Sequence, residues 1–375
     1  MNFIHRQMQK RIEDSLFKGK VVVIYGARQV GKTTIVKNLQ KKYPDSIYLN
    51  CDEPDVREAL TNASSVEIKS FIGDKKIVFL DEAQRVKNIG LSLKLIMENF
   101  PEMQVVATGS SSFELSNQIS EPLTGRKYEF LIHPFSIKEL SSGQSEADIN
   151  RSLENRLIFG MYPEVAIKSG EEQKQAIKDI TKSYLFKDVL QYQNIKNPEI
   201  LEKLLQALAL QVGNEVSYPE LAETINVDKK TVVNYIDILE KAFIIFQLNP
   251  FSRNLRNELK KLRKIYFFDN GIRNALVNNF NPVDLRNDIG SLWENFMISE
   301  RMKFNNNNNI DNNIYFWRTH DKKEIDYLEE RDGKISAFEF KWKKDNANSP
   351  KIFLETYKNS EFELVNRNNY QKFVL

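Results

Sequence analysis

The segment from Gly26 to Thr33 has residue types and spacing suited to binding phosphate. Gly26 and Gly31 precede Lys32 and Thr33, and the segment lies between a β-branched run (21–25) and a helical pattern. Glycine lets the backbone turn tightly so that its N–H groups face phosphates, and the following helix N-terminus adds a favourable dipole. The pattern predicts a phosphate-binding loop, or P-loop. The residues expected to bind the nucleotide are Gly26, Ala27, Arg28, Gln29, Val30, Gly31, Lys32, Thr33 and Thr34.

Four side chains are expected to act on a bound nucleoside triphosphate. Lys32 should reach the β and γ phosphates, and Thr33 should ligate Mg²⁺. Asp81 and Glu82 end an apolar run that predicts a buried strand. Asp81 would hold Mg²⁺ through water, and Glu82 would polarise the attacking water. Acidic residues at a strand end can simply face solvent, but the P-loop earlier in the chain favours a catalytic role. The expected cofactors are ATP and Mg²⁺, and we find no guanine-reading motif.

Two further positions have weaker patterns. Ser110 follows the predicted strand 104–109, where a polar residue could sense the γ-phosphate. A simple turn at the strand end explains the same residues. Arg126 follows Gly125 and could act as an arginine finger on the nucleotide of a neighbouring subunit. A solvated arginine is the alternative.

The strand candidates indicate an α/β fold for the N-terminal part. Apolar runs at 21–25, 47–50, 76–81 and 104–109 alternate with helical patterns, as in a parallel sheet. A chain of 375 residues favours more than one domain. The expected domains are a P-loop core at 1–135, a helical lid or connector at 136–199, a winged helix-turn-helix at 200–256 and a C-terminal α/β domain at 257–375.

The winged helix-turn-helix is predicted from two short helices around a tight turn. Pro219 fits a first helical turn, and Asp228 can cap a second helix at 229–241. In such a fold the start of the second helix faces a DNA groove, and the basic segment 251–264 could contact phosphates. The residues expected to contact double-stranded DNA are Lys229, Lys230, Thr231 and Asn234. Packing of this region against a protein partner is the alternative.

Taken together, the motifs resemble the AAA+-like ATPases of bacteria and archaea that carry a C-terminal domain of unknown function. The matching segments are YGARQVGKTT, FLDEAQ, TGSSSFEL, LTGRKYEFLIHPFSIKEL, FGMYPEV, SYPELAETINVDKKTVVNYIDILEKAFII, KIYFFDNGI, SLWENFMISE and EIDY…FEFKW. The resemblance implies an AAA+-like core, a helical lid, a winged helix and a restriction-endonuclease-like C-terminal fold. It departs from the wider AAA+ pattern in that no second sensor arginine is evident in the lid.

The C-terminal part contains carboxylates that resemble the metal site of the PD-(D/E)xK nuclease fold. Glu339 and Lys341 share one face of a predicted strand, and Asp326 lies on the preceding strand of a hairpin with an Asp-Gly turn. Glu294, on a helix predicted at 290–304, could add a carboxylate. Such a cluster would bind Mg²⁺, with the lysine stabilising charge. Alternating charge on the solvent face of a hairpin is the alternative. The asparagine run 305–309 is expected to be a loop.

Composition sets outer limits on function. The formal net charge is +3. The chain has one cysteine, Cys51, which excludes an intrachain disulfide. With one cysteine and three histidines, a metal cluster held by Cys or His is disfavoured. No apolar run is long enough for a membrane span, and a cytoplasmic location is expected. The sequence predicts a Mg²⁺-dependent ATPase that works as a switch or motor, with DNA as the candidate substrate. An ATPase that regulates protein partners through non-catalytic C-terminal modules stays open as the alternative.

Overall fold

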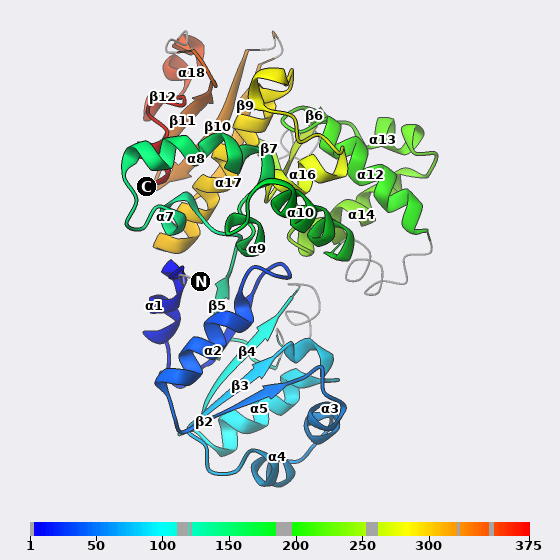
Figure 1. Ribbon diagram of the computed structural model, residues 1–375, viewed down its shortest axis with the longest axis vertical. Coiled ribbons are helices and arrows are strands. Elements are labelled where there is room, and N and C mark those ends of the chain that lie inside the picture. The colour runs from blue at the N-terminus through cyan, green and yellow to red at the C-terminus, as the bar shows by residue number, and fades with distance from the viewer. Residues whose placement is uncertain are drawn as a thin grey trace. The chain divides into compact units, whose positions relative to one another are not determined.

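The computed structural model describes residues 4–110, 119, 122–184, 197–252, 262–319, 321, 323–344 and 349–375. It divides into two compact units (Figure 1). The first comprises 1–134 with 241–243, and the second comprises 135–240 and 244–375. The lid, winged-helix and nuclease-like divisions expected within 136–375 therefore stay predictions.

The first unit is built on a five-stranded parallel sheet with the order β2-β3-β4-β1-β5. Its strands are β1 (Val21–Tyr25), β2 (Ser46–Asn50), β3 (Ile77–Asp81), β4 (Gln104–Gly109) and β5 (Lys127–Leu131). Its helices are α1 (Gln7–Glu13), α2 (Lys32–Lys42), α3 (Pro54–Leu60), α4 (Ser65–Ile72), α5 (Ile89–Asn99) and the 3₁₀ turn η1 (Ala83–Arg85). This confirms the predicted α/β fold with a parallel sheet.

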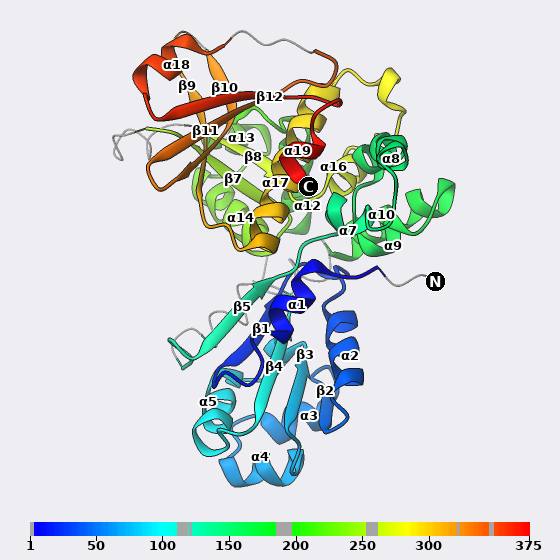
Figure 2. The same cartoon turned by 90° about the vertical axis from the view of Figure 1, so that its left-hand side faces the viewer.

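Both faces of this sheet are covered, which explains the apolar runs of the sequence. Every residue of β1, β3 and β4 is buried. Val21 and Val23 pack in one cluster with Leu93 and Ile96 of α5. Figure 2 shows α2 on the other side of the sheet from α5. A strand buried on both faces has no polar alternation, so its sequence is a continuous hydrophobic run.

The second unit contains a seven-stranded sheet with the order β12-β11-β10-β9-β7-β8-β6. Its strands are β6 (Glu215–Val216), β7 (Ile245–Pro250), β8 (Arg263–Phe267), β9 (Asn313–Arg318), β10 (Glu324–Arg331), β11 (Lys334–Phe340) and β12 (Ser360–Val365). Its N-terminal helices are α7 (Ile137–Leu140), α8 (Glu146–Phe159), α9 (Pro163–Ala166), α10 (Gly170–Tyr184), α12 (Pro198–Leu210), α13 (Tyr218–Thr224) and α14 (Lys229–Lys241). The others are α16 (Asn270–Leu276), η3 (Val283–Leu285), α17 (Ile289–Asn308), α18 (Lys351–Thr356) and α19 (Gln371–Val374).

The predicted helix-turn-helix region and the C-terminal part share this sheet. Strand β7 pairs antiparallel with β8. It also pairs in parallel with β9, where Asn249 lies opposite Tyr315. The expected division between 200–256 and 257–375 falls between β7 and β8, which are partners. Elements α13, α14, β6, β7 and β8 are those that a winged helix needs, and that assignment stays a prediction.

The structure corrects the prediction for the asparagine run. Residues 305–309 are predicted to form a loop, but α17 continues through Asn308, and only Asn309 takes the left-handed conformation that ends the helix. Tertiary contact explains the difference, because the buried Asn305 amide donates to Glu329 at 2.6 Å. Low sequence complexity therefore did not prevent this run from continuing the helix.

The hairpin predicted from Asp332-Gly333 is present between β10 and β11. Both residues have positive φ, 51° and 76°, as the tight turn of a two-residue hairpin requires. Within the described part of the chain, no helix is both long and apolar enough to cross a membrane.

Candidate functional site

The P-loop follows β1 and leads into α2, as predicted. Gly26 has φ 151°, and a Cβ there would lie 2.2 Å from the carbonyl oxygen of Ile132. Gly31 has φ 99° and precedes the first residue of α2. Only glycine fits the first position without displacing backbone, which gives a structural reason for the residue that begins the motif.

The lysine of the P-loop lies within the loop itself. Lys32 is 4% exposed, and its ammonium donates to the carbonyl oxygens of Gly26 at 2.9 Å and Ala27 at 2.8 Å. Arg6, which precedes α1, donates from the other side to the carbonyl oxygens of Val30 at 2.9 Å and His133 at 2.6 Å. Sequence patterns did not indicate Arg6, because its partners are backbone atoms distant in the chain.

The aspartate that ends β3 is surrounded by hydroxyl groups. Asp81 is 3% exposed. Its Oδ2 accepts hydrogen bonds from Thr33 Oγ1 at 2.8 Å and from the Tyr48 hydroxyl at 2.6 Å. Its Oδ1 accepts one from Thr108 Oγ1 at 2.5 Å. The structure thus brings Thr33 and Asp81 together as expected, and adds Tyr48, which sequence patterns did not indicate.

The neighbouring glutamate is held by a glutamine. Glu82 has φ 54°, and its N–H donates to Thr108 Oγ1 at 3.0 Å. The Gln84 amide donates to the Glu82 carboxylate at 2.6 Å and to Ser110 Oγ at 3.0 Å. Because β4 lies between β1 and β3, its end carries Ser110 to the same edge of the sheet. Ser110 therefore contacts the partner of Glu82; the rest of the TGSSSFEL segment, from residue 111, lies outside the described residues.

Negative charge at this edge affects two nearby groups. Burial, followed by the hydrogen bond to Asp81, raises the pKa of the Tyr48 phenol well above its ordinary value. Burial, followed by the charge of Asp81, raises the pKa of the Cys51 thiol to about 12. Both groups are therefore protonated near neutral pH, and Tyr48 is a hydrogen-bond donor.

Arg126 lies at the other end of the strands. It precedes β5, and its carbonyl oxygen accepts from the N–H of Val21, the first residue of β1, whereas the P-loop follows the last residue of β1. Its guanidinium pairs with Glu98 at 2.5 Å and is 46% exposed. The structure does not bring Arg126 to the P-loop of its own chain.

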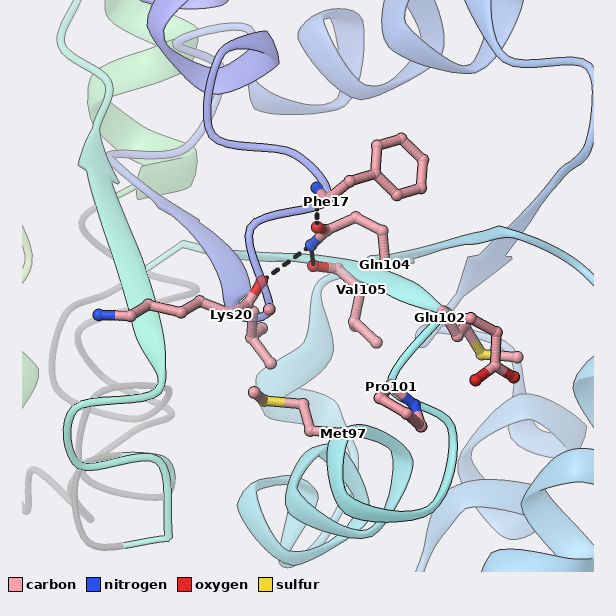
Figure 3. Close-up of a pocket in the computed structure, with 10 residues that line it drawn as sticks. Phe17, Lys20, Met97, Pro101, Glu102, Gln104 and Val105 are labelled. Carbon is pink, nitrogen blue, oxygen red and sulfur yellow. Dashed lines mark hydrogen bonds between the residues drawn. The ribbon is translucent and has the colours of Figure 1, made fainter.

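A cavity of about 190 Å³ opens at this same amino-terminal edge of the sheet (Figure 3). The buried Gln104 side chain lies beside it, accepting from the Phe17 N–H at 2.6 Å and donating to the Lys20 carbonyl at 3.0 Å. These contacts position the chain before β1. The cavity does not adjoin the phosphate-binding edge.

In the second unit, the carboxylates predicted for a metal site occur with lysines. Asp326 is 8% exposed and accepts from the Phe340 N–H at 2.8 Å. Burial, followed by the charges of Glu294 and Glu339, raises the pKa of Asp326 well above its ordinary value. Lys341 pairs with Glu339 at 2.7 Å. Glu294 and Glu339 are therefore close enough to Asp326 to affect its charge.

Lys264 is the central cation of this group. It is 1% exposed and pairs with Glu294 at 3.1 Å and with Glu324. The sequence interpretation counted Lys264 among basic residues that could contact DNA phosphates, and its burial shows that this was wrong. Among the residues that the structure describes, no group of three or more His, Cys, Asp or Glu side chains is placed to hold a metal ion.

The predicted DNA-contacting residues lie in the first turns of α14. Lys229, Lys230 and Asn234 are exposed. Thr231 instead takes part in capping, because its N–H and its hydroxyl donate to the Asp228 carboxylate at 2.9 Å and 2.7 Å. Most of the basic segment that follows, residues 253–261, lies outside the described residues.

Three family models match successive parts of the chain. Residues 18–141 match a family model described as an AAA domain. Residues 150–283 and 289–373 match two models described as domains of unknown function, DUF8612 and DUF4143. The first match, together with the parallel sheet of the first unit, supports a P-loop ATPase fold for residues 18–141.

Similar proteins include two that are described as uncharacterized. One, from Mycobacterium tuberculosis, is 27% identical over 90% of this chain and 73% of its own length. Another, from Methanocaldococcus jannaschii, is 27% identical over 86% of this chain and 74% of its own length. A Walker-type ATPase of Pyrococcus abyssi has a similar fold, with TM-score 0.51 and 17% identity over 73% of this chain and 96% of that one.

Proposed function

We propose that this protein binds ATP with Mg²⁺ and hydrolyses it at the edge formed by the P-loop, Asp81 and Glu82. The hydrogen bond between Thr33 and Asp81 is the observation that carries the proposal, because it joins the P-loop to the acidic end of β3. The similarity to an AAA domain and to the fold of a Walker-type ATPase supports it.

The residues present fit Mg²⁺. This cation prefers oxygen ligands and is usually held by one or two carboxylates together with substrate phosphates and water. Thr33 supplies a hydroxyl oxygen whose proton is donated to Asp81, so its lone pairs stay available. Thr33 and, through water, Asp81 would hold the ion. When bound, Mg²⁺ would neutralise charge on the phosphates.

The remaining steps belong to side chains of this chain. The Lys32 ammonium would exchange its two loop carbonyls for phosphate oxygens. Glu82 would orient a water for attack on the γ-phosphorus and take its proton as the bond to the leaving ADP oxygen breaks. Gln84 connects Glu82 to Ser110, which supports Ser110 as a sensor of the γ-phosphate.

The direct test removes the P-loop ammonium. We expect Lys32→Ala to abolish ATP binding and hydrolysis, measured by equilibrium binding of a fluorescent ATP analogue and by phosphate release. Lys18→Ala is the matched control, because Lys18 is an exposed lysine of the same unit before β1. ATP hydrolysis retained by purified Lys32→Ala protein would refute the proposal.

Arg126 would act on the nucleotide of a neighbouring subunit. Arg126 lies at the end of the strands opposite its own P-loop, and its guanidinium is partly exposed. Both observations support an arginine finger that acts between chains and not within one chain. We expect Arg126→Ala to lower turnover while leaving ATP affinity unchanged, and to do so only at protein concentrations where subunits associate. Equal turnover of the variant at high concentration would exclude the finger.

We further propose that ATP drives work on double-stranded DNA. The exposed residues at the start of α14 support this use. We expect DNA to stimulate ATP hydrolysis, and expect Lys229→Ala/Lys230→Ala to reduce the slope of log affinity against log salt by about 2. Lys203→Ala/Lys372→Ala removes two exposed lysines of the same unit as a control. An unstimulated ATPase at low salt would instead favour regulation of a protein partner.

Metal-dependent cleavage of DNA by the second unit is a second candidate. The grouping of the buried Asp326 with Glu294 and Glu339 supports it, because carboxylates that perturb one another are frequent in active sites. Lys341 beside Glu339 is placed to stabilise charge. We expect wild-type protein with Mg²⁺ or Mn²⁺ to cut DNA and Asp326→Ala to lose this activity. Cutting that survives the substitution would exclude Asp326 as the metal-holding residue.

A further inference from the structure

Tyr48 contacts the same oxygen of Asp81 as the P-loop threonine does. Its hydroxyl lies 2.6 Å from Asp81 Oδ2, and Thr33 Oγ1 lies 2.8 Å from that atom. Tyr48 belongs to β2, which is an edge strand of the first sheet and pairs in parallel with β3. The contact therefore depends on the pairing of two strands and is independent of the P-loop motif.

The three hydroxyl groups fix the direction of the carboxylate. Oδ2 receives protons from Thr33 and Tyr48, and Oδ1 receives one from Thr108. These donors come from α2, β2 and β4, so rotation of the carboxylate breaks bonds to three different elements. A carboxylate oxygen accepts about two hydrogen bonds in its plane, so Oδ2 is fully used.

This arrangement decides which oxygen can face a cation. Thr33 donates its only hydroxyl proton to Asp81, so the lone pairs of Thr33 Oγ1 point elsewhere. Asp81 would have to give up two hydrogen bonds to turn Oδ2 toward a metal ion. Tyr48 adds one of these bonds and thereby favours the orientation in which the threonine, not the aspartate, is the direct ligand.

We propose that Tyr48 is a positioning residue for the divalent cation, acting through Asp81 to keep the Thr33 hydroxyl oriented as a ligand. The inference rests on the proposed ATP site. Groups that orient metal ligands typically contribute about 10- to 100-fold in metal affinity or activity. The Lys37 ammonium lies 5.7 Å from the Tyr48 ring centroid, so the ring also packs beneath α2. The test must therefore distinguish the effect of the Tyr48 hydroxyl from the effect of its ring.

Tyr48→Phe removes the hydroxyl and keeps the ring. The measurement is equilibrium binding of a non-hydrolysable ATP analogue at increasing Mg²⁺ concentration, which needs no turnover. We expect Tyr48→Phe to require about 10-fold more Mg²⁺ for half-maximal binding, with the metal-free affinity for the analogue unchanged. With Mn²⁺ in place of Mg²⁺, the electron paramagnetic resonance spectrum of the bound complex should broaden, because the ligand oxygen is less well oriented.

Tyr218→Phe is the matched control. Tyr218 is also half-buried, and its hydroxyl donates at 2.6 Å to Gln247 in the second unit. It should leave the Mg²⁺ requirement unchanged. Thermal unfolding of both variants shows whether either substitution disturbs the fold.

A double substitution tests whether Tyr48 acts through Asp81. In an Asp81→Asn background, Tyr48→Phe should cause no further change in the Mg²⁺ requirement. Additive effects would show that Tyr48 acts through packing and would overturn the inference, as would an unchanged Mg²⁺ midpoint in Tyr48→Phe alone. Absence of Mg²⁺-dependent binding in the wild type would instead refute the proposed function itself.

Discussion

Each of the two units buries an aspartate, and the two carboxylates have different surroundings. Asp81, in the first unit, is 3% exposed and accepts hydrogen bonds from Thr33, Tyr48 and Thr108. Asp326, in the second, is 8% exposed, accepts from a backbone N–H and lies near Glu294 and Glu339. One site is lined by neutral donors and the other by further acids.

The difference lies in where the compensating positive charge comes from. Neutral hydroxyls orient a carboxylate without cancelling its charge, so Asp81 can still attract a cation brought with a substrate. In the second unit the cations are already present, since Lys264 pairs with Glu294 and Glu324, and Lys341 pairs with Glu339. The first arrangement suits a site that binds and releases Mg²⁺, whereas the second already has part of its compensating positive charge within the fold.

The strongest test of this comparison is the same substitution at both aspartates. We expect Asp81→Asn to lower ATP turnover by about 100-fold, because the substitution removes the negative charge and one acceptor of the network. Asp326→Asn should leave ATP turnover unchanged. Phosphate release under saturating ATP and Mg²⁺ measures both.

Thermal unfolding of the two variants serves as the control, since both substitutions replace a buried carboxyl group with an amide. Similar losses of turnover in Asp81→Asn and Asp326→Asn would break the comparison. That result would mean that ATP hydrolysis in the first unit depends on Asp326 of the second unit.

A second test removes the cation of the second unit. Lys264→Met leaves the partly exposed carboxylates of Glu294 and Glu324 without their ammonium. The free energy of unfolding should fall by roughly 3 kcal/mol, the low end for a broken buried pair, because both carboxylates keep some exposure to water. The three tryptophans of the chain, Trp293, Trp317 and Trp342, all lie in the second unit, so fluorescence in a urea titration follows that unit.

Lys203→Met is the control because Lys203 is exposed on α12. It should change the urea midpoint little. If Lys264→Met is as stable as the control, the carboxylates are not neutralised by this lysine, and they would have charge available for a metal ion.

The place of the P-loop relative to the strands could be predicted from the sequence because the residues that set it follow local rules. Gly26 and Lys32 belong to one short motif, and Asp81 ends a run whose burial follows from its composition. The parallel order of strands then brings their carboxyl ends to one edge. Spacing and strand type were sufficient because parallel sheets impose this geometry.

The residues that sequence reasoning missed depend on tertiary pairing. Tyr48 reaches Asp81 only because β2 lies beside β3, and nothing in the run 46–50 distinguishes its tyrosine from a core residue. Lys264 was assigned to a basic surface because its neighbours in sequence are basic, but residues 264–267 of β8 are all buried and Lys264 pairs with Glu294 and Glu324. Asn305 extends a helix because Glu329 accepts its amide proton. Each case requires a partner that is distant in the chain.

The smallest effect we predict concerns a carboxylate of the second unit that is paired with a guanidinium. Glu329 is 7% exposed and accepts from Arg301 Nε at 2.9 Å and from an Arg301 terminal nitrogen at 2.8 Å. Burial alone would raise the pKa of Glu329, but the hydrogen bonds and charge of Arg301 outweigh it, and the pKa lies below its ordinary value of 4.5. The pKa of Asp326 is shifted in the opposite direction, because burial and the charges of Glu294 and Glu339 outweigh the charge of Lys264.

The sign of this shift fixes a pH dependence. A carboxyl whose pKa is lower in the folded state stabilises that state above the unfolded value of 4.5, and the contribution disappears as pH falls through the folded pKa. Glu329→Gln should therefore be less stable than the wild type near neutral pH, and the difference should shrink in acid. Urea midpoints from tryptophan fluorescence at several pH values measure it.

Glu361→Gln provides the surface control, since Glu361 pairs with Lys334 at 2.8 Å with both side chains more than half exposed. Such a pair contributes about 0–1 kcal/mol, so its removal should matter little at any pH. If the difference in urea midpoint between the wild type and Glu329→Gln stayed constant in acid, the cause of the difference would be packing. Arg301 would then not be the group that keeps Glu329 ionised, and the second unit would neutralise its buried acids less completely than its ion pairs suggest.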